Sequence, residues 1–152
     1  MDTYSALSRR HLLASGVAVA AASALAAPAL AEPQDVDSHA RKLMGQFTAK
    51  EGRVHLKIKD VAESGANEPI GVTVDSPMTP ADHVKAIHVL AEGNPYPVVA
   101  SWYLTPRMGR AEVNFRIRLA KTQVVRAYAV LSDGSVWVTR QEVKVTIGGC
   151  GG

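Results

Sequence analysis

Apolar and polar residues alternate in the second half of this chain, and this alternation constrains the fold more than any other feature. The pattern is clearest over residues 111–119. Because successive side chains of a β-strand point to opposite faces of a sheet, it predicts a strand with one buried and one solvated face. A contact with a partner is the alternative role for the polar face. The apolar residues are Ala111, Val113, Phe115, Ile117 and Leu119, and the polar residues are Glu112, Asn114, Arg116 and Arg118.

Similar runs, bounded by Pro and Gly residues, recur from Val54 to Ile147 and predict about seven strands. Ser132-Asp133-Gly134-Ser135 predicts a hairpin turn before the last strand. Since no long helical pattern separates the runs, we expect an all-β, two-sheet antiparallel sandwich and not a parallel α/β sheet. The predicted strands cover residues 54–59, 70–75, 84–92, 97–105, 111–119, 123–132 and 136–147.

A short helix is predicted before the first strand, over residues 35–46. Its apolar residues recur with the period of 3.6 that places them on one face of a helix. Asp35 and Asp37 suit the start of a helix, and Arg41 and Lys42 suit its later turns, because these charges complement the helix dipole. The helix is expected to pack against this domain or a partner through Val36, Ala40, Leu43, Met44 and Phe47.

The first 31 residues are predicted to be a twin-arginine signal peptide. Ser8-Arg9-Arg10-His11-Leu12-Leu13 carries the arginine pair, an Ala-rich apolar stretch follows, and Ala29-x-Ala31 fits a cleavage site after Ala31. An uncleaved membrane anchor is the alternative, but alanine is only weakly apolar and Pro28 interrupts the stretch. We therefore expect export to the periplasm. Because this route usually carries folded cargo, the protein is expected to fold quickly or to acquire a partner subunit before export.

The length and composition of the chain allow one domain of modest charge. The 152 residues include 17 basic and 14 acidic residues, and the formal net charge is +3. No block of like charge indicates a nucleic-acid partner. The single cysteine, Cys150, excludes an internal disulfide and any zinc or iron–sulfur site built from several cysteines. The expected organisation is a signal peptide (1–31), a domain of a helix and a β-sandwich (32–147) and a terminal arm (148–152).

The terminal segment reads Gly148-Gly149-Cys150-Gly151-Gly152. Because glycine has the loosest backbone of any residue, we expect a flexible arm that presents a sterically bare thiol. A model thiol pKa of about 8.5 leaves only a few per cent as thiolate at neutral pH. We interpret Cys150 as a thiol on which other proteins act, and we expect no catalytic residue, metal site or bound cofactor in this chain.

Three other interpretations of the terminal segment remain open. The cysteine is incidental in a frayed tail, or it forms a structural disulfide between two chains. The final Gly-Gly also matches ubiquitin-like sulfur carriers, but their activation needs ATP in the cytoplasm, and the predicted export signal argues against it. A disulfide-linked homodimer alone does not decide between them, because an exposed carrier thiol also oxidises.

No other residues form a convincing chemical motif. His83 and His88 are five positions apart, so we expect them on opposite sides of a strand, and a solvated or core role is expected for each histidine. The remaining histidines of the mature chain are His39 and His55. Core or subunit-interface positions are expected for Trp102, Trp137, Tyr103 and Tyr128.

The C-terminal sequence from Val143 to Gly152 resembles the tail of the SoxY family, which carries sulfur in the periplasmic thiosulfate-oxidising Sox system. The resemblance extends over essentially the whole chain. It implies an immunoglobulin-like sandwich and a carrier without catalytic activity of its own. Body segments that also resemble this family are residues 73–78, 87–95 and 116–123.

The resemblance further implies that thiosulfate is conjugated to Cys150, first as an S-thiosulfonate and then as a persulfide. The implied stable partner is SoxZ, in a heterodimer. The implied transient partners are the haem protein SoxXA, the manganese hydrolase SoxB and a molybdenum–haem sulfur dehydrogenase. A structural β-sandwich that dimerises through Cys150, and a periplasmic redox or metal-binding module, are the alternative functions.

Overall fold

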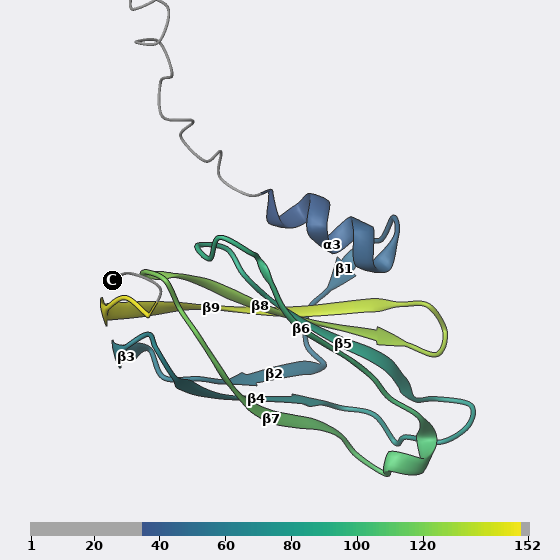
Figure 1. Ribbon diagram of the computed structural model, residues 1–152. Helices are drawn as coiled ribbons and strands as arrows, with labels where there is room; N and C mark the ends of the chain where they lie inside the picture. Colours follow the sequence, from purple (N-terminus) through teal and green to yellow (C-terminus); the bar gives the residue numbers. More distant parts are fainter. Residues whose placement is uncertain (1–34, 150–152) are drawn as a thin grey trace, which may run out of the picture. The chain divides into compact units, whose positions relative to one another are not determined.

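The alternating segments form two stacked β-sheets over residues 35–149, the part of the chain that this computed structural model describes (Figure 1). The larger sheet has the strand order β1-β9-β8-β5-β6, and β3 pairs with β9 outside this path. The second sheet has the order β2-β4-β7. The predicted all-β, immunoglobulin-like sandwich is confirmed. The strands are β1 (Ala49–Lys50), β2 (Val54–Lys57), β3 (Val61–Ser64), β4 (Glu68–Val74), β5 (Val84–Ala91), β6 (Val98–Tyr103), β7 (Ala111–Ile117), β8 (Gln123–Leu131) and β9 (Val136–Ile147).

The main core lies between the two sheets. Val72 of β4, Ile87 of β5 and Val125 of β8 are fully buried there. Trp102 and Phe115 pack against each other across the sandwich, with ring centroids 4.5 Å apart and ring planes inclined by 57°. The polar residues of β7 and of the turn after it are exposed, so the solvated face predicted for residues 111–119 is confirmed.

Two short strands, β1 and β3, are absent from the sequence prediction. Both pair in parallel with β9, with Ala49 opposite Val136 and Ser64 opposite Ile147. The other strand pairs of the described region are antiparallel. Segments of two and four residues are too short to show a period, and only their tertiary position makes them strands.

The predicted helix is present as α3 (Val36–Met44), which ends two residues before the predicted boundary. The side chain of Asp35 caps it by accepting a hydrogen bond of 3.0 Å from the backbone N–H of Asp37. It ends at Gly45, whose φ of 75° lies in the left-handed region that glycine tolerates. Within the described residues, no helix is both long and apolar enough to span a membrane.

The helix covers the outer face of the larger sheet (Figure 1). Val36 and Ala40 are buried in a second apolar cluster that includes Leu90, Tyr128 and Val138 of the sheet. Leu43, Met44 and Phe47 pack against the same cluster, so the predicted apolar face is confirmed in full and packs within this domain.

Arg126 of β8 joins the helix to the sheet through charge. Its Nη1 lies 2.8 Å from Oδ1 of Asp37 in α3, and its Nε donates a hydrogen bond to Glu92 beyond β5. Burial alone would lower the pKa of Arg126, but hydrogen bonds with Tyr128 and Glu92 outweigh it, and the pKa is raised. The guanidinium therefore stays charged and holds two segments that are distant in sequence.

The predicted hairpin between β8 and β9 is also confirmed. Gly134 has a φ of 82°, which favours glycine at this position of the turn. Asp133 Oδ1 accepts hydrogen bonds from the hydroxyl of Ser135 at 2.7 Å and from its backbone N–H at 2.8 Å. These bonds lower the pKa of Asp133 and stabilise its charged form.

Candidate functional site

The predicted site lies at the end of β9, where the chain leaves the sandwich. Of the predicted arm residues the structure describes Gly148 and Gly149, and Cys150, Gly151 and Gly152 lie outside the described residues. The position of Gly149 therefore fixes the point from which Cys150 continues. This point is next to β3, because Ser64 pairs with Ile147, the last residue of β9.

A chain of backbone hydrogen bonds surrounds this point. The N–H of Gly65 donates to the carbonyl of Ile147 at 2.7 Å, and the N–H of Leu119 donates to the carbonyl of Gly65 at 2.7 Å. The N–H of Gly149 donates in turn to the carbonyl of Leu119 at 2.9 Å. We call the backbone of Gly65, Ala66, Leu119 and Ala120 the arm seat.

The arm seat leaves no space for side chains on the first two glycines of the arm. A Cβ atom on Gly148 would lie 2.3 Å from the carbonyl oxygen of Ala120, and one on Gly149 would lie 2.2 Å from that of Gly65. Neither glycine has a positive φ, so the close approach of the backbone, and not an unusual conformation, requires glycine here. The flexible arm was predicted to begin at Gly148; in the structure, both described glycines lie against the arm seat.

The expectation that His83 and His88 face opposite sides of a strand is wrong. Both histidines line one hollow of about 400 Å³ on the outer face of the larger sheet, beside the end of α3. The pairing of β5 with β8 shifts register between Val84 and Ala86. Such a bulge changes the phase of the alternation, so two residues an odd number of positions apart reach the same face.

His88 has the predicted core role. It is only 2% exposed, and its Nδ1 lies 2.7 Å from the hydroxyl of Ser101. Burial lowers the pKa of His88 and favours the neutral ring. The Nδ1 atom of His83 is buried without a hydrogen-bond partner, and no group of three potential metal-ligating side chains occurs within residues 35–149.

The other two histidines of residues 35–149 have exposed, local contacts. His55 Nε2 lies 2.8 Å from Oδ2 of Asp75, and more than half of each side chain is exposed. His39 Nδ1 lies 3.0 Å from the carbonyl oxygen of Asp35 at the start of α3. Of the two roles expected for each histidine, solvated or core, these two histidines have the solvated one.

The aromatic residues divide between the interior and the surface. Tyr128 is buried under α3. Trp137 is covered by two cationic side chains, with Nζ of Lys50 5.8 Å and Cζ of Arg53 5.2 Å from the centroid of its ring. Tyr103, at the end of β6, is 76% exposed. A core position is thus excluded for Tyr103, and the interface position remains a prediction.

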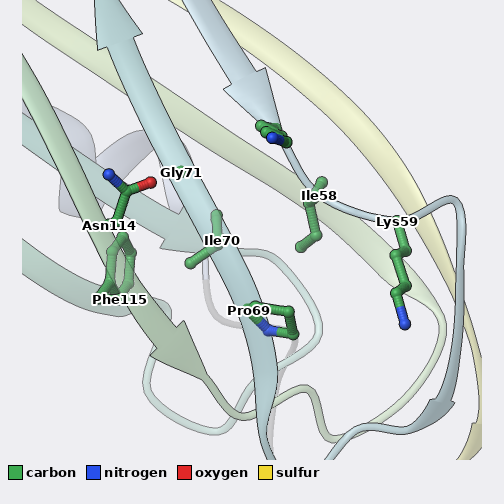
Figure 2. A pocket seen from close by; sticks show the side chains of 8 residues that line it. Ile58, Lys59, Pro69, Ile70, Gly71, Asn114 and Phe115 are labelled. Atoms are coloured by element: carbon green, nitrogen blue, oxygen red, sulfur yellow. The ribbon is translucent and has the colours of Figure 1, made fainter.

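A second hollow, of about 440 Å³, lies over β4 and was not predicted (Figure 2). It lies beside Gly71, in the middle of the strand, where a Cβ atom would lie only 2.7 Å from Oδ1 of Asn114 of β7. A glycine inside a strand pattern was the signal in the sequence that indicated such a close approach. The lining residues are Lys57, Ile58, Lys59, Pro69, Ile70, Gly71, Asn114 and Phe115.

The fold and the site together define a small β-sandwich domain whose last strand continues into a glycine-flanked cysteine. The family model for sulfur oxidation protein SoxY matches residues 40–150, and the chain belongs to the SoxY family. The structure is similar to that of the sulfur carrier protein SoxY from Chlorobium limicola f thiosulfatophilum, with a TM-score of 0.63 and 30% sequence identity. This match covers 74% of the present chain and 96% of that chain.

Superoxide reductases share the fold at lower identity. The enzyme (neelaredoxin) from Ignicoccus hospitalis matches with a TM-score of 0.55 and 20% identity, over 62% of this chain and 80% of that chain. A putative superoxide reductase from Thermotoga maritima matches with a TM-score of 0.54 and 18% identity, over 64% and 93% of the two chains. At these identities the likeness concerns the sandwich alone. No curated protein matches this chain.

Proposed function

We propose that this protein is a covalent carrier of sulfur intermediates in thiosulfate oxidation and that Cys150 is the attachment point. The observation that carries the proposal is the SoxY family match, which extends through residue 150 and so includes the only cysteine of the chain. The similarity to a sulfur carrier protein from Chlorobium limicola f thiosulfatophilum supports the same function.

The proposed cycle begins with the thiolate of Cys150 and thiosulfate. A new S–S bond joins them as a cysteine S-thiosulfonate, and the two electrons released pass to the haem protein SoxXA. Water then attacks the terminal sulfone at SoxB, which releases sulfate and two protons and leaves a persulfide on Cys150. A sulfur dehydrogenase, where present, takes six electrons from the outer persulfide sulfur while three water molecules supply its oxygens and six protons are released. A second hydrolysis then releases sulfate and regenerates the thiol.

In this cycle the carrier contributes position, and its partners contribute redox and hydrolytic chemistry. The sandwich serves as a rigid handle for recognition, and the terminal segment delivers the bound sulfur. Glycines on both sides of Cys150 suit this function, because they let the thiol enter a narrow active site. The protein is accordingly proposed to be a substrate of the Sox enzymes and not an enzyme itself.

A heterodimer with SoxZ is also proposed, and the outer edge of β6 is its proposed contact. Within the described residues β6 pairs only with β5, so its other edge has unpaired backbone groups (Figure 1). No charged residue occurs in β6 that would oppose pairing with a strand of the partner sandwich. Three of the large apolar residues that are exposed lie along or beside it, namely Tyr96, Tyr103 and Met108.

The periplasm is the proposed location. Residues 1–31, the proposed twin-arginine signal peptide, lie outside the described residues, and the proposal rests on the arginine pair and the Ala29-x-Ala31 cleavage pattern. Thiosulfate oxidation by the Sox system is periplasmic, which agrees with this assignment.

Intact-protein mass spectrometry without reductant tests the carrier function. In material from thiosulfate-grown cells we expect reducible masses above that of the mature chain, matching sulfane or thiosulfonate additions and mapping to the peptide that contains Cys150. A single unmodified mass during thiosulfate oxidation would contradict the proposal. A constitutive disulfide dimer without sulfur adducts would instead favour the structural β-sandwich.

A further inference from the structure

We propose that Gly65, which lies in the body of the protein, is a positioning residue for Cys150. Because Gly65 has no side chain, Gly149 can dock against its backbone in the arm seat. Gly65 thereby determines whether the start of the arm is docked on the body or released. The proposal rests on the proposed function of Cys150 for its biological meaning, but its geometry involves described residues only.

Gly65 is held on both sides by its own backbone. It follows β3, its N–H donates to Ile147 of β9, and its carbonyl accepts from Leu119 in the turn between β7 and β8. The residue is buried. Both of its polar backbone groups are therefore satisfied, and its position is fixed by two segments distant in sequence.

Gly65 and Gly149 lie so close to the surrounding backbone that neither position has space for a side chain. A Cβ atom on Gly65 would lie 2.1 Å from the carbonyl oxygen of Leu119 and 3.0 Å from the N of Gly149. A Cβ atom on Gly149 would lie 2.2 Å from the carbonyl oxygen of Gly65 and 2.6 Å from the N of Ala66. A methyl group at either position thus removes the place in which Gly149 donates to Leu119.

Among residues 35–149, the hydrogen bond from the N–H of Gly149 to the carbonyl of Leu119 holds the docked arm. The net contribution of such a bond favours the docked over the released state by about fivefold. On release, the segment from Ile147 to Cys150 gains a reach of roughly 10 Å when extended. A partner enzyme that draws Cys150 into its active site binds the released state. The apparent affinity of that enzyme for the carrier is therefore its affinity for the released state multiplied by the fraction of carrier that is released.

Three single substitutions separate docking from crowding at the thiol. Gly65→Ala and Gly149→Ala both block docking, the first from the body and the second from the arm. Gly151→Ala is the matched control, because it places the same methyl group next to Cys150 on the side away from Gly149. If Gly65→Ala does not fold, Gly149→Ala still carries the test, because its methyl group is on the arm.

The first measurement is amide hydrogen exchange at residue 149 by NMR. We expect exchange about fivefold slower than the intrinsic rate in the wild type and in Gly151→Ala, and exchange at the intrinsic rate in Gly65→Ala and Gly149→Ala. An unprotected amide in the wild type would overturn the docked state.

The second measurement is the kinetics of thiosulfate conjugation by the haem protein partner. Relative to Gly151→Ala, we expect KM for the carrier to fall about fivefold in Gly149→Ala, with kcat unchanged. Relative to the wild type, Gly65→Ala should show the same fall, and the double variant should add nothing to Gly149→Ala. Equal kinetics for Gly149→Ala and Gly151→Ala would overturn the positioning function of Gly65.

The two measurements also separate this inference from the proposed function. If conjugation proceeds with Cys150→Ser, the carrier function fails. Hydrogen exchange at residue 149 needs no Sox enzyme, so it decides on the docked arm in either case.

Discussion

Burial of His88 couples the stability of the sandwich to pH at the level of one side chain. The ring is buried on the outer face of the larger sheet, and Ser101 is its hydrogen-bond partner. Tyr103 packs edge-on against it, with the two ring centroids 6.0 Å apart. Because burial lowers its pKa below the ordinary histidine value of 6.5, the folded protein binds this proton less readily than the unfolded chain. Protonation therefore favours unfolding.

We predict that the free energy of unfolding decreases as the pH falls below about 6.5, the pKa of an unfolded histidine, and that this decrease ends below the folded pKa. One proton gives a slope of at most about 1.4 kcal/mol per pH unit. Urea unfolding between pH 7.5 and 5 measures the slope. His88→Gln should reduce it, because it removes the buried titrating ring. Equal slopes for the wild type and His88→Gln would exclude this cause.

At the scale of elements, local patterns predicted what local physics determines. The alternation located seven strands and the 3.6-residue period located α3, because both patterns reflect burial of one face. β1 and β3 were missed because their pairing with β9 is set by tertiary contacts. The bulge in β5 and the arm seat also depend on backbone segments distant in sequence, so the shared face of His83 and His88 could not be predicted.

The attachment of α3 gives a prediction for one element. Arg126→Leu should reduce the free energy of unfolding by about 1–3 kcal/mol, because it leaves Asp37 and Glu92 without their charged partner. Chemical denaturation measures the loss, and hydrogen exchange should show that the amides of α3 lose protection first. The exposed Arg118→Leu is the control, with an expected change within about 0.5 kcal/mol. A loss of the same size in both variants would contradict a specific contribution of Arg126.

The free edge of β6 gives a second prediction at this scale. Tyr103→Glu should weaken binding of SoxZ about tenfold or more, because it places a charge where an exposed aromatic ring is proposed to be buried. Val61→Glu on β3 is the matched control, since Val61 is also exposed and apolar. Binding is measured by titration of purified SoxZ. If Val61→Glu weakens the complex and Tyr103→Glu does not, the interface lies near β3 and not at β6.

At the scale of the whole molecule, stability and proposed chemistry belong to different parts of the chain. Within residues 35–149, the two apolar clusters extend from residue 36 to residue 145, before the terminal segment. Gly148 and Gly149 connect these parts, and their backbone contacts with the arm seat set the starting point of the arm. Changes to the thiol and changes to the core are therefore expected to have separable effects.

Cys150→Ser tests this separation directly. A serine hydroxyl cannot form the S–S bond, so we expect thiosulfate conjugation to fall to background, whereas the melting temperature should stay within about 1 °C of the wild type. Calorimetry and thiosulfate-dependent turnover with purified Sox proteins measure the two effects. Arg126→Leu is the opposite control, with lower stability and conjugation retained at temperatures where it remains folded. Sustained turnover with Cys150→Ser would contradict covalent attachment of sulfur to a cysteine of this protein, because the chain contains no other cysteine.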